Sequence, residues 1–320
     1  MNLLALFNPA TPLPEAPASK LPPPEQALIF AMIAALISGL FLLQRRAGGA
    51  VSVGHWLPHD DDTGKRAYEV WVLAYSVVWM GCFGFIIALE LYEAFDASTY
   101  FVLCGGLALP LWVQALRAAS VRGGGAMHAL RAQLWVAVFG FIGNYWYTHY
   151  FYSVLRARYT MPSWRLNDVP IAMYFATHFY FASYHVFANL VLRKVRTRYA
   201  AGVARDVLFV GLVLAMSYAV AFMETLTISH FPYYDFEDRA MAYTVGSAFY
   251  GLYFVVSFPI YFAIDEATWT TPLAPGRSFV EIAISSLGAG MTVLLMLDLV
   301  RLGVVGAPLI IGGKLFEVTG

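Results

Sequence analysis

Long apolar runs separated by short polar connections dominate the chain from residue 27 onward. A helix needs about 20 mostly apolar residues to cross a bilayer, and charged residues or proline normally bound such a run. Eight segments approach or reach this length: residues 27–44, 68–90, 98–117, 132–153, 170–192, 205–227, 241–263 and 281–302. The pattern predicts an all-α, polytopic transmembrane helix bundle of about eight spanning helices.

The ends of the chain differ from this apolar body. Residues 1–26 are rich in proline and alanine and predict a flexible leader, since proline disfavours both helix and strand. Residues 27–44 then predict an N-terminal membrane anchor rather than a cleaved signal, because the leader before them is long and has acidic as well as basic residues. We expect the membrane domain over residues 65–302 and a C-terminal tail over residues 303–320.

The composition is typical of an integral membrane protein. Hydrophobic residues make up 60% of the chain and charged residues 12%, whereas soluble domains are about 25% charged. The formal net charge is zero, and without a basic face we expect no nucleic-acid partner. Cys82 and Cys104 both lie in apolar runs, so we expect neither a disulfide framework nor a cysteine-based zinc site.

Lysine and arginine predict which helix ends lie together. They are concentrated in alternate connections, which we therefore expect on the cytoplasmic side, although Arg156, Arg158 and Arg165 lie on the other side and weaken the bias. In this topology six acidic or imidazole side chains fall towards the opposite membrane face: Glu90, Glu93, His149, His178, Glu224 and Asp298. We expect widely separated parts of the chain to converge there.

The segment from Asn144 to Trp164 is too polar for a helix that faces lipid. Its polar and aromatic side chains follow three- and four-residue spacing, which places them on one helical face: Asn144, Tyr145, Thr148, His149 and Tyr152. Polar groups at membrane depth indicate a functional site. Hydrogen bonding between helices is the alternative role, particularly for Asn144 and Thr148.

His178 and His185 lie seven residues apart on the next apolar segment. Two stacked histidines can hold haem or a metal, so a haem electron carrier is one alternative function. The sequence has no second histidine pair at matching depth, and we expect no metal site. His185 is predicted to be a hydrogen-bonded core residue, whereas His178 is expected closer to the membrane face at which the acidic side chains gather.

Glu224 follows a long apolar run without an adjacent basic partner. Burial favours the neutral form of a carboxyl group, and a neutral acid in a dry site can donate a proton that its conjugate base later retrieves. The alternative is a structural hydrogen bond to Ser217, Tyr218 or an imidazole of another helix.

The stretch HFPYYDFEDRAMAY at residues 230–243 mixes aromatic and charged side chains after Glu224. Tyr233 and Tyr234 fit either an interfacial aromatic belt or a binding pocket, and Asp238 either a solvated charge or a site residue. Asp265 and Glu266, towards the other membrane face, are expected to be ordinary cap or loop acids.

Seven motifs occur in order along the chain: YTHYFYSVL, YTMPSW, THFYFASYH, FMETLTI, FPYYDFEDRAMAY, YFVVSFPIYF and SLGAGMTVLLMLDLVRL. Together they resemble the cycloeucalenol cycloisomerase family over about residues 65–302. The leader and first anchor depart from the family pattern, as does His230, where the family pattern has asparagine. High alanine, arginine and glycine content is typical of a bacterial member.

The resemblance implies an isomerase of sterol biosynthesis that opens the 9,19-cyclopropane ring of a cyclopropyl sterol, as from cycloeucalenol to obtusifoliol, without a cofactor. Protonation of the bridging methylene leaves a tertiary cation, and loss of a neighbouring proton leaves an alkene. A dry pocket strengthens the donor, and aromatic faces stabilise the cation.

On this basis Glu224 is the expected proton donor or acceptor and His149 its partner, with His178 and Asp238 as further catalytic candidates. The expected substrate-binding residues are aromatic: Trp146, Tyr147, Tyr152, Trp164, Tyr233 and Tyr234. The expected partners are a sterol and membrane lipid, in the bacterial inner membrane or, for a eukaryotic chain, the endoplasmic reticulum. A non-enzymatic membrane sterol-binding or transport protein is the alternative, because the same pocket serves it.

Overall fold

The computed structural model describes residues 52–120, 127–228, 231–237, 241–266, 276–311 and 316–319, together with separate helical residues between 27 and 39. The predicted leader, residues 1–26, lies outside the described residues. So do most positions of the predicted anchor, residues 27–44.

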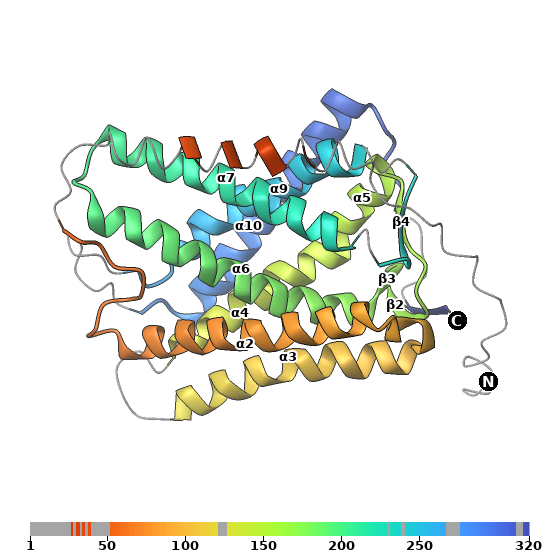
Figure 1. The fold of residues 1–320 in the computed structure, drawn as a ribbon, viewed down its shortest axis with the longest axis horizontal. Coiled ribbons are helices and arrows are strands. Elements are labelled where there is room, and N and C mark those ends of the chain that lie inside the picture. The colour runs from red at the N-terminus through yellow and green to blue at the C-terminus, as the bar shows by residue number, and fades with distance from the viewer. Residues whose placement is uncertain are drawn as a thin grey trace.

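Each of the seven apolar segments predicted after the anchor is helical, and the helices run back and forth along the long axis of the molecule (Figure 1). The helices are α2 (Thr63–Ala88), α3 (Ala97–Ser120), α4 (His128–Ile142), α5 (Thr148–Val154), α6 (Ile171–Arg198), α7 (Val203–Ile228), α9 (Ser247–Phe262) and α10 (Phe279–Val300). Short turns extend them: the 3-10 turn η2 (Leu91–Ala94) and the π-helical turns η3 (Gly143–Tyr147), η4 (Ala242–Gly246) and η5 (Arg301–Val305).

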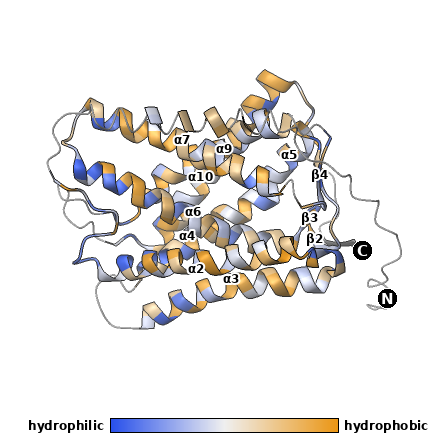
Figure 2. Ribbon diagram, in the orientation of Figure 1, coloured by the Kyte–Doolittle hydropathy of each residue, from blue (hydrophilic) through white to orange (hydrophobic). Residues whose placement is uncertain are grey.

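Five helices among the described residues are long and apolar enough to cross a membrane: Thr63–Ala88, Ala97–Ser120, Val203–Ile228, Ala242–Phe262 and Phe279–Val305. The middles of α2, α3 and α7 are largely hydrophobic, and hydrophilic residues gather towards the helix ends (Figure 2). Large apolar side chains such as Val77, Val102 and Leu295 are exposed, which suits contact with lipid rather than water. The chain is therefore a multi-pass membrane helix bundle, with five clear spans in the described part rather than the predicted eight.

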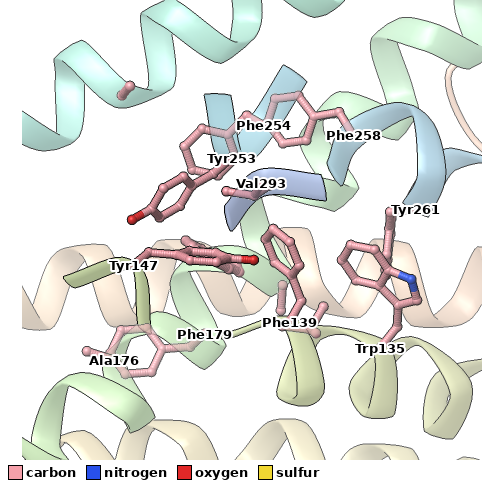
Figure 3. Close-up of a cluster of buried hydrophobic side chains, with 14 of the residues drawn as sticks. Trp135, Phe139, Tyr147, Ala176, Phe179, Tyr253, Phe254, Phe258, Tyr261 and Val293 are labelled. Atoms are coloured by element: carbon pink, nitrogen blue, oxygen red, sulfur yellow. The ribbon is translucent and has the colours of Figure 1, made fainter. Parts of the chain in front are cut away.

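Helix α6 lies at the centre of the bundle and packs against α2, α3, α4, α7 and α9. Aromatic side chains fill the space around it, including Phe139, Phe254 and Phe258 (Figure 3). His185 is fully buried among them, with Nδ1 2.7 Å from the Phe181 carbonyl oxygen and Nε2 2.9 Å from the Ser257 hydroxyl. The prediction of a hydrogen-bonded core histidine is confirmed.

A buried ion network joins α2, α6 and the end of α9. The Arg193 guanidinium donates to Glu69 Oε1 at 2.7 Å and to Glu266 Oε1 at 2.6 Å, and the Lys65 ammonium also pairs with Glu266. Asp265 accepts from Arg131 at 3.2 Å. The prediction that Asp265 and Glu266 are ordinary cap or loop acids was wrong: both are buried partners of cations supplied by other helices, a long-range pairing that no local pattern reveals.

Two small antiparallel sheets lie at the other end of the bundle and add to the predicted all-α fold. One pairs β1 (Ala157–Tyr159) with β4 (Tyr234–Phe236), and the other orders β3 (Val169–Pro170), β2 (Ser163–Leu166) and β5 (Phe316–Thr319). Such short strands have no periodicity of their own, and the β1–β4 and β2–β5 pairings join segments that are distant in sequence. The β1–β4 pairing holds the chain after α5 against the chain after α7.

Candidate functional site

Glu224 lies in the last turns of α7 and points its carboxyl group towards two tyrosines of other helices. The Tyr250 hydroxyl on α9 donates to Glu224 Oε2 at 2.8 Å, and the Tyr184 phenol on α6 interacts with the same carboxyl group. Among the described residues, neither Ser217, Tyr218 nor an imidazole, the predicted alternatives, is bonded to this carboxyl group. Both tyrosines can donate hydrogen bonds to a carboxylate, so the site is built to hold Glu224 in either protonation state.

Glu224 lines a first cavity of about 660 Å³, which we call the polar cavity. Its wall comes from η3, α5, α6, α7, β4, η4 and α9, and its oxygen-bearing side chains, besides Glu224, are Asn144, Thr148, Tyr159, Thr177, Thr225, Tyr234, Tyr250 and Tyr253. Glu224 is the one carboxyl group in this wall within the described residues.

A second cavity of about 760 Å³, which we call the apolar cavity, lies between α2, α3, α6 and α7. Hydrocarbon and aromatic side chains dominate its wall, among them Phe83, Ile86 and Leu103. The two cavities share Met173, Glu224 and Ile228. Glu224 therefore lies at their common wall.

Aromatic rings surround the polar cavity. Tyr159 on β1 stacks on Tyr234 on β4 with ring centroids 4.3 Å apart, and the Tyr250 and Tyr253 rings on α9 lie edge to face at 4.8 Å. Burial raises the pKa of both Tyr159 and Tyr234 above the ordinary phenol value, so these two phenols stay neutral. Their π-faces can therefore stabilise a cation formed in the cavity.

His149, the predicted partner of Glu224, is fully buried on α5 but lies outside both cavity walls. Its ring meets Tyr152 edge to face at 5.7 Å, and the Asn167 backbone and the Asp168 carboxylate lie nearby. Within the described residues neither ring nitrogen makes a hydrogen bond of normal geometry. The structure thus gives Glu224 tyrosine partners in the place predicted for this imidazole.

His178 lies outside the walls of both cavities. His178 stacks on Trp112, with centroids 5.2 Å apart and planes at 5°, and lines a separate groove between α3, α4 and α6. Asp238 lies outside the described residues. Across the part of the chain that the structure covers, no group of three or more His, Cys, Asp or Glu side chains could hold a metal ion.

Of the six aromatic residues predicted to bind substrate, one lines a cavity and three pack against wall residues. Tyr234 lines the polar cavity, and Tyr233 packs edge to face against Tyr92 and Phe231, which line the apolar cavity. The convergence of distant segments that the topology predicted is therefore present at this end of the bundle, where the ends of α2, α5 and α7 meet the strands (Figure 1).

Tyr147 and Tyr152 lie behind the wall of the polar cavity, where the Tyr147 ring meets Tyr253 at 4.6 Å and the Tyr152 ring meets Tyr159 at 6.3 Å. The Tyr147 hydroxyl donates to the Gly290 carbonyl at 2.9 Å and the Tyr152 hydroxyl to the Asp168 carbonyl at 3.1 Å. Trp164 packs on Phe101, and Trp146 is 40% exposed.

Tyr184 and Tyr250 are the residues that the sequence analysis missed. Each lies in an aromatic-rich helix where a tyrosine resembles ordinary core or interface packing. Tyr180 and Tyr184, four residues apart on α6, share a helical face, and that repeat was the available signal. No sequence pattern distinguishes Tyr250, because its role depends on the packing of α9 against α7.

The chain resembles a known enzyme over most of its length. It is 37% identical over 265 residues to cycloeucalenol cycloisomerase of Arabidopsis thaliana, and the alignment covers 79% of this chain and 91% of that protein. No protein-family profile matches the chain, and no solved structure matches it. Identity at this level across nearly the whole relative extends through the helices that form both cavities, and the chain belongs to the cycloeucalenol cycloisomerase family.

Proposed function

We propose that this protein is an isomerase that opens the 9,19-cyclopropane ring of a cyclopropyl sterol, with Glu224 as the proton donor. The observation that carries the proposal is the position of Glu224 at the wall shared by the polar cavity and the apolar cavity. The related Arabidopsis protein is named for the same reaction on cycloeucalenol. A multi-pass bundle suits a substrate that dissolves in membranes, in the inner membrane of a bacterial source or the endoplasmic reticulum of a eukaryotic one.

The reaction begins with proton transfer from the Glu224 carboxyl group to the bridging methylene. The bond between the methylene and one ring-junction carbon breaks, and its electron pair takes the proton to form a methyl group. A tertiary cation remains at the ring junction. The Glu224 carboxylate left behind accepts hydrogen bonds from Tyr250 and Tyr184, which stabilise developing negative charge.

The second step removes a proton from a ring carbon next to the cation. The electrons of that C–H bond form the new double bond, and the Glu224 carboxylate retrieves the proton, which restores the acid. The proton count and oxidation state of the sterol skeleton are unchanged, so the chemistry requires no redox cofactor. The neutral phenol rings of Tyr159 and Tyr234 stabilise the cation between the two steps.

His149, His178 and Asp238 are secondary candidates in this scheme. His149 and His178 each follow a threonine that lines the polar cavity, Thr148 and Thr177. A role for the His149 imidazole would be to orient α5 or to accept the second proton. Because its ring lies outside both walls, we expect His149→Asn to lower turnover less than any change at Glu224, as measured by steady-state kinetics.

A direct test incubates the purified protein with a cyclopropyl sterol and follows the high-field ring-methylene proton signals by NMR. An isomerase removes these signals and produces a new methyl signal in equal amount. Binding of the sterol with the ring signals intact would instead identify a sterol-binding or transport protein.

A further inference from the structure

The two cavities that meet at Glu224 differ in polarity, so together they form a site with one polar end and one apolar end. The wall of the polar cavity includes Asn144, Thr148 and Thr177, whereas the wall of the apolar cavity has no amide side chain within the described residues. A ligand with one polar end and one hydrocarbon end would therefore bind across Glu224 in a single orientation.

Two hydroxyl groups of the polar cavity are only weakly engaged with the protein, whereas the Asn144 amide nitrogen donates to the Gly140 carbonyl at 2.9 Å and leaves Oδ1 facing Thr177. The Thr177 hydroxyl donates to Asn144 Oδ1 at 3.4 Å, and the Thr148 hydroxyl to the Gly143 carbonyl at 3.5 Å. Hydroxyl hydrogen bonds normally measure about 2.5–3.0 Å. Both hydroxyl groups can thus turn to a ligand at little cost, unlike Thr225, which donates to the Ala221 carbonyl at 2.8 Å.

Two π-helical turns help to form the same cavity. Asn144 belongs to η3 and Thr148 follows it, while Ala242 and Gly246 belong to η4, and all four residues line the wall. Such turns are rare and occur frequently at functional sites, because the extra residue re-aims the side chains of that turn. The polar cavity is therefore a shaped binding surface rather than a packing defect.

A cyclopropyl sterol has the matching asymmetry. Its single hydroxyl group is on ring A, at one end of a long hydrocarbon skeleton, and its flexible side chain is at the other end. The bridging methylene joins a carbon at the junction of rings A and B to a carbon at the junction of rings B and C, so it lies nearer the hydroxyl end than the end that carries the side chain. A proton donor that reaches this methylene must therefore lie near the polar end of the bound molecule, as Glu224 does.

We infer that the sterol binds with its 3-hydroxyl group in the polar cavity, hydrogen-bonded to Thr177 and Asn144, and with its side chain in the apolar cavity. This orientation rests on the proposed function of Glu224. It makes Thr177 a determinant of 3-hydroxyl recognition and the apolar wall, including Leu103, the determinant of side-chain length.

The test compares two substrates, a 3-hydroxy cyclopropyl sterol and its 3-deoxy analogue, on the wild-type protein and on Thr177→Val. We expect the substitution to lower kcat/KM about tenfold for the hydroxy sterol, mainly through KM, since one hydrogen bond is lost. The deoxy analogue should be turned over equally by both proteins. Thr292→Val is the matched control, because Thr292 is an exposed α10 residue outside both cavities.

A second variant tests the other end of the molecule. Leu103→Phe enlarges a partly exposed wall residue of the apolar cavity, and we expect it to slow turnover of the full sterol more than that of an analogue with a truncated side chain. Equal effects of Thr177→Val on the hydroxy and deoxy substrates would overturn the orientation, and so would equal effects of Leu103→Phe on long and short side chains. Full activity of Glu224→Gln would instead overturn the proposed function itself.

Discussion

At the scale of single residues, the site depends on how the surroundings of Glu224 balance its two protonation states. Its position in an apolar helix favours the neutral acid, while hydrogen bonds from phenols favour the carboxylate. Tyr250 at 2.8 Å is the better defined of these donors. The neutral acid can therefore carry the proton, and the phenols stabilise the carboxylate that remains after the proton has been transferred.

Removing the Tyr250 hydroxyl should weaken proton donation. We expect Tyr250→Phe to lower kcat by about 100-fold, the usual effect of losing one preorganised donor to developing negative charge, with a small change in KM. Steady-state kinetics measure both. Tyr174→Phe is the control, since the Tyr174 hydroxyl donates to the Leu166 carbonyl away from both cavities. Equal losses in the two variants would argue against a specific role for Tyr250.

Sequence reasoning at this scale identified the acid but not its partners. Glu224 was conspicuous because a carboxyl group in an apolar run is unusual whatever surrounds it. Tyr184 and Tyr250 could not be chosen among 20 tyrosines, because their roles depend on which helix faces are in contact. His149 was given the partner role because it shares a membrane depth with Glu224, and depth alone does not set distance.

At the scale of helices and strands, opposite ends of the bundle are held by different interactions. The ion network of Lys65, Glu69, Arg193 and Glu266 joins α2, α6 and the end of α9 at one end. The β1–β4 pairing and the π-helical turns shape the cavities at the other end. The ion network holds α2, α6 and the end of α9 together. The site residues on α6 and α9, Tyr184 and Tyr250, depend on the same helix packing.

The ion network should make stability depend on pH in the acid range. Burial raises the pKa of Glu266, but Lys65 and Arg193 outweigh burial and its pKa lies below the ordinary value; His128 and Arg131 similarly lower the pKa of Asp265 against its burial. A carboxyl group whose pKa is lowered by folding stabilises the protein above its unfolded pKa. That contribution is lost as the pH falls through the folded pKa.

We therefore expect the thermal midpoint in detergent to be steady above about pH 5 and to fall below about pH 4. Glu266→Gln should lower the midpoint at neutral pH, because it leaves buried cations with less counter-charge, and should flatten the acid slope, with Asp265 retaining part of it. Exposed Glu93→Gln serves as the control. An unchanged acid slope in Glu266→Gln would show that protonation of Glu266 does not cause the loss of stability at low pH.

At the scale of the whole molecule, apolar periodicity and length predicted the bundle because the bilayer imposes both. All seven predicted segments between residues 68 and 302 are helical. The count of clear spans differs for three reasons. Most of the predicted anchor lies outside the described residues, and the segment at residues 132–153 is divided among α4, η3 and α5. Helix α6 is rich in polar residues such as His185, Asn189 and Arg193, which are buried at the centre of the bundle. The small sheets and the division into two cavities arise only when distant segments meet, so no local pattern contains them.

The central claim is that the Glu224 carboxyl group protonates the sterol cyclopropane. Its most direct test is ring opening by Glu224→Gln, followed as the loss of the ring-methylene NMR signals, beside the wild-type protein and Glu93→Gln, an exposed acid outside both cavities. Glutamine keeps the shape and can still accept from Tyr250 but cannot supply the proton. We expect intact ring signals with Glu224→Gln, retained sterol binding, and wild-type conversion with Glu93→Gln. Conversion by Glu224→Gln at a rate near that of the wild type would contradict the claim.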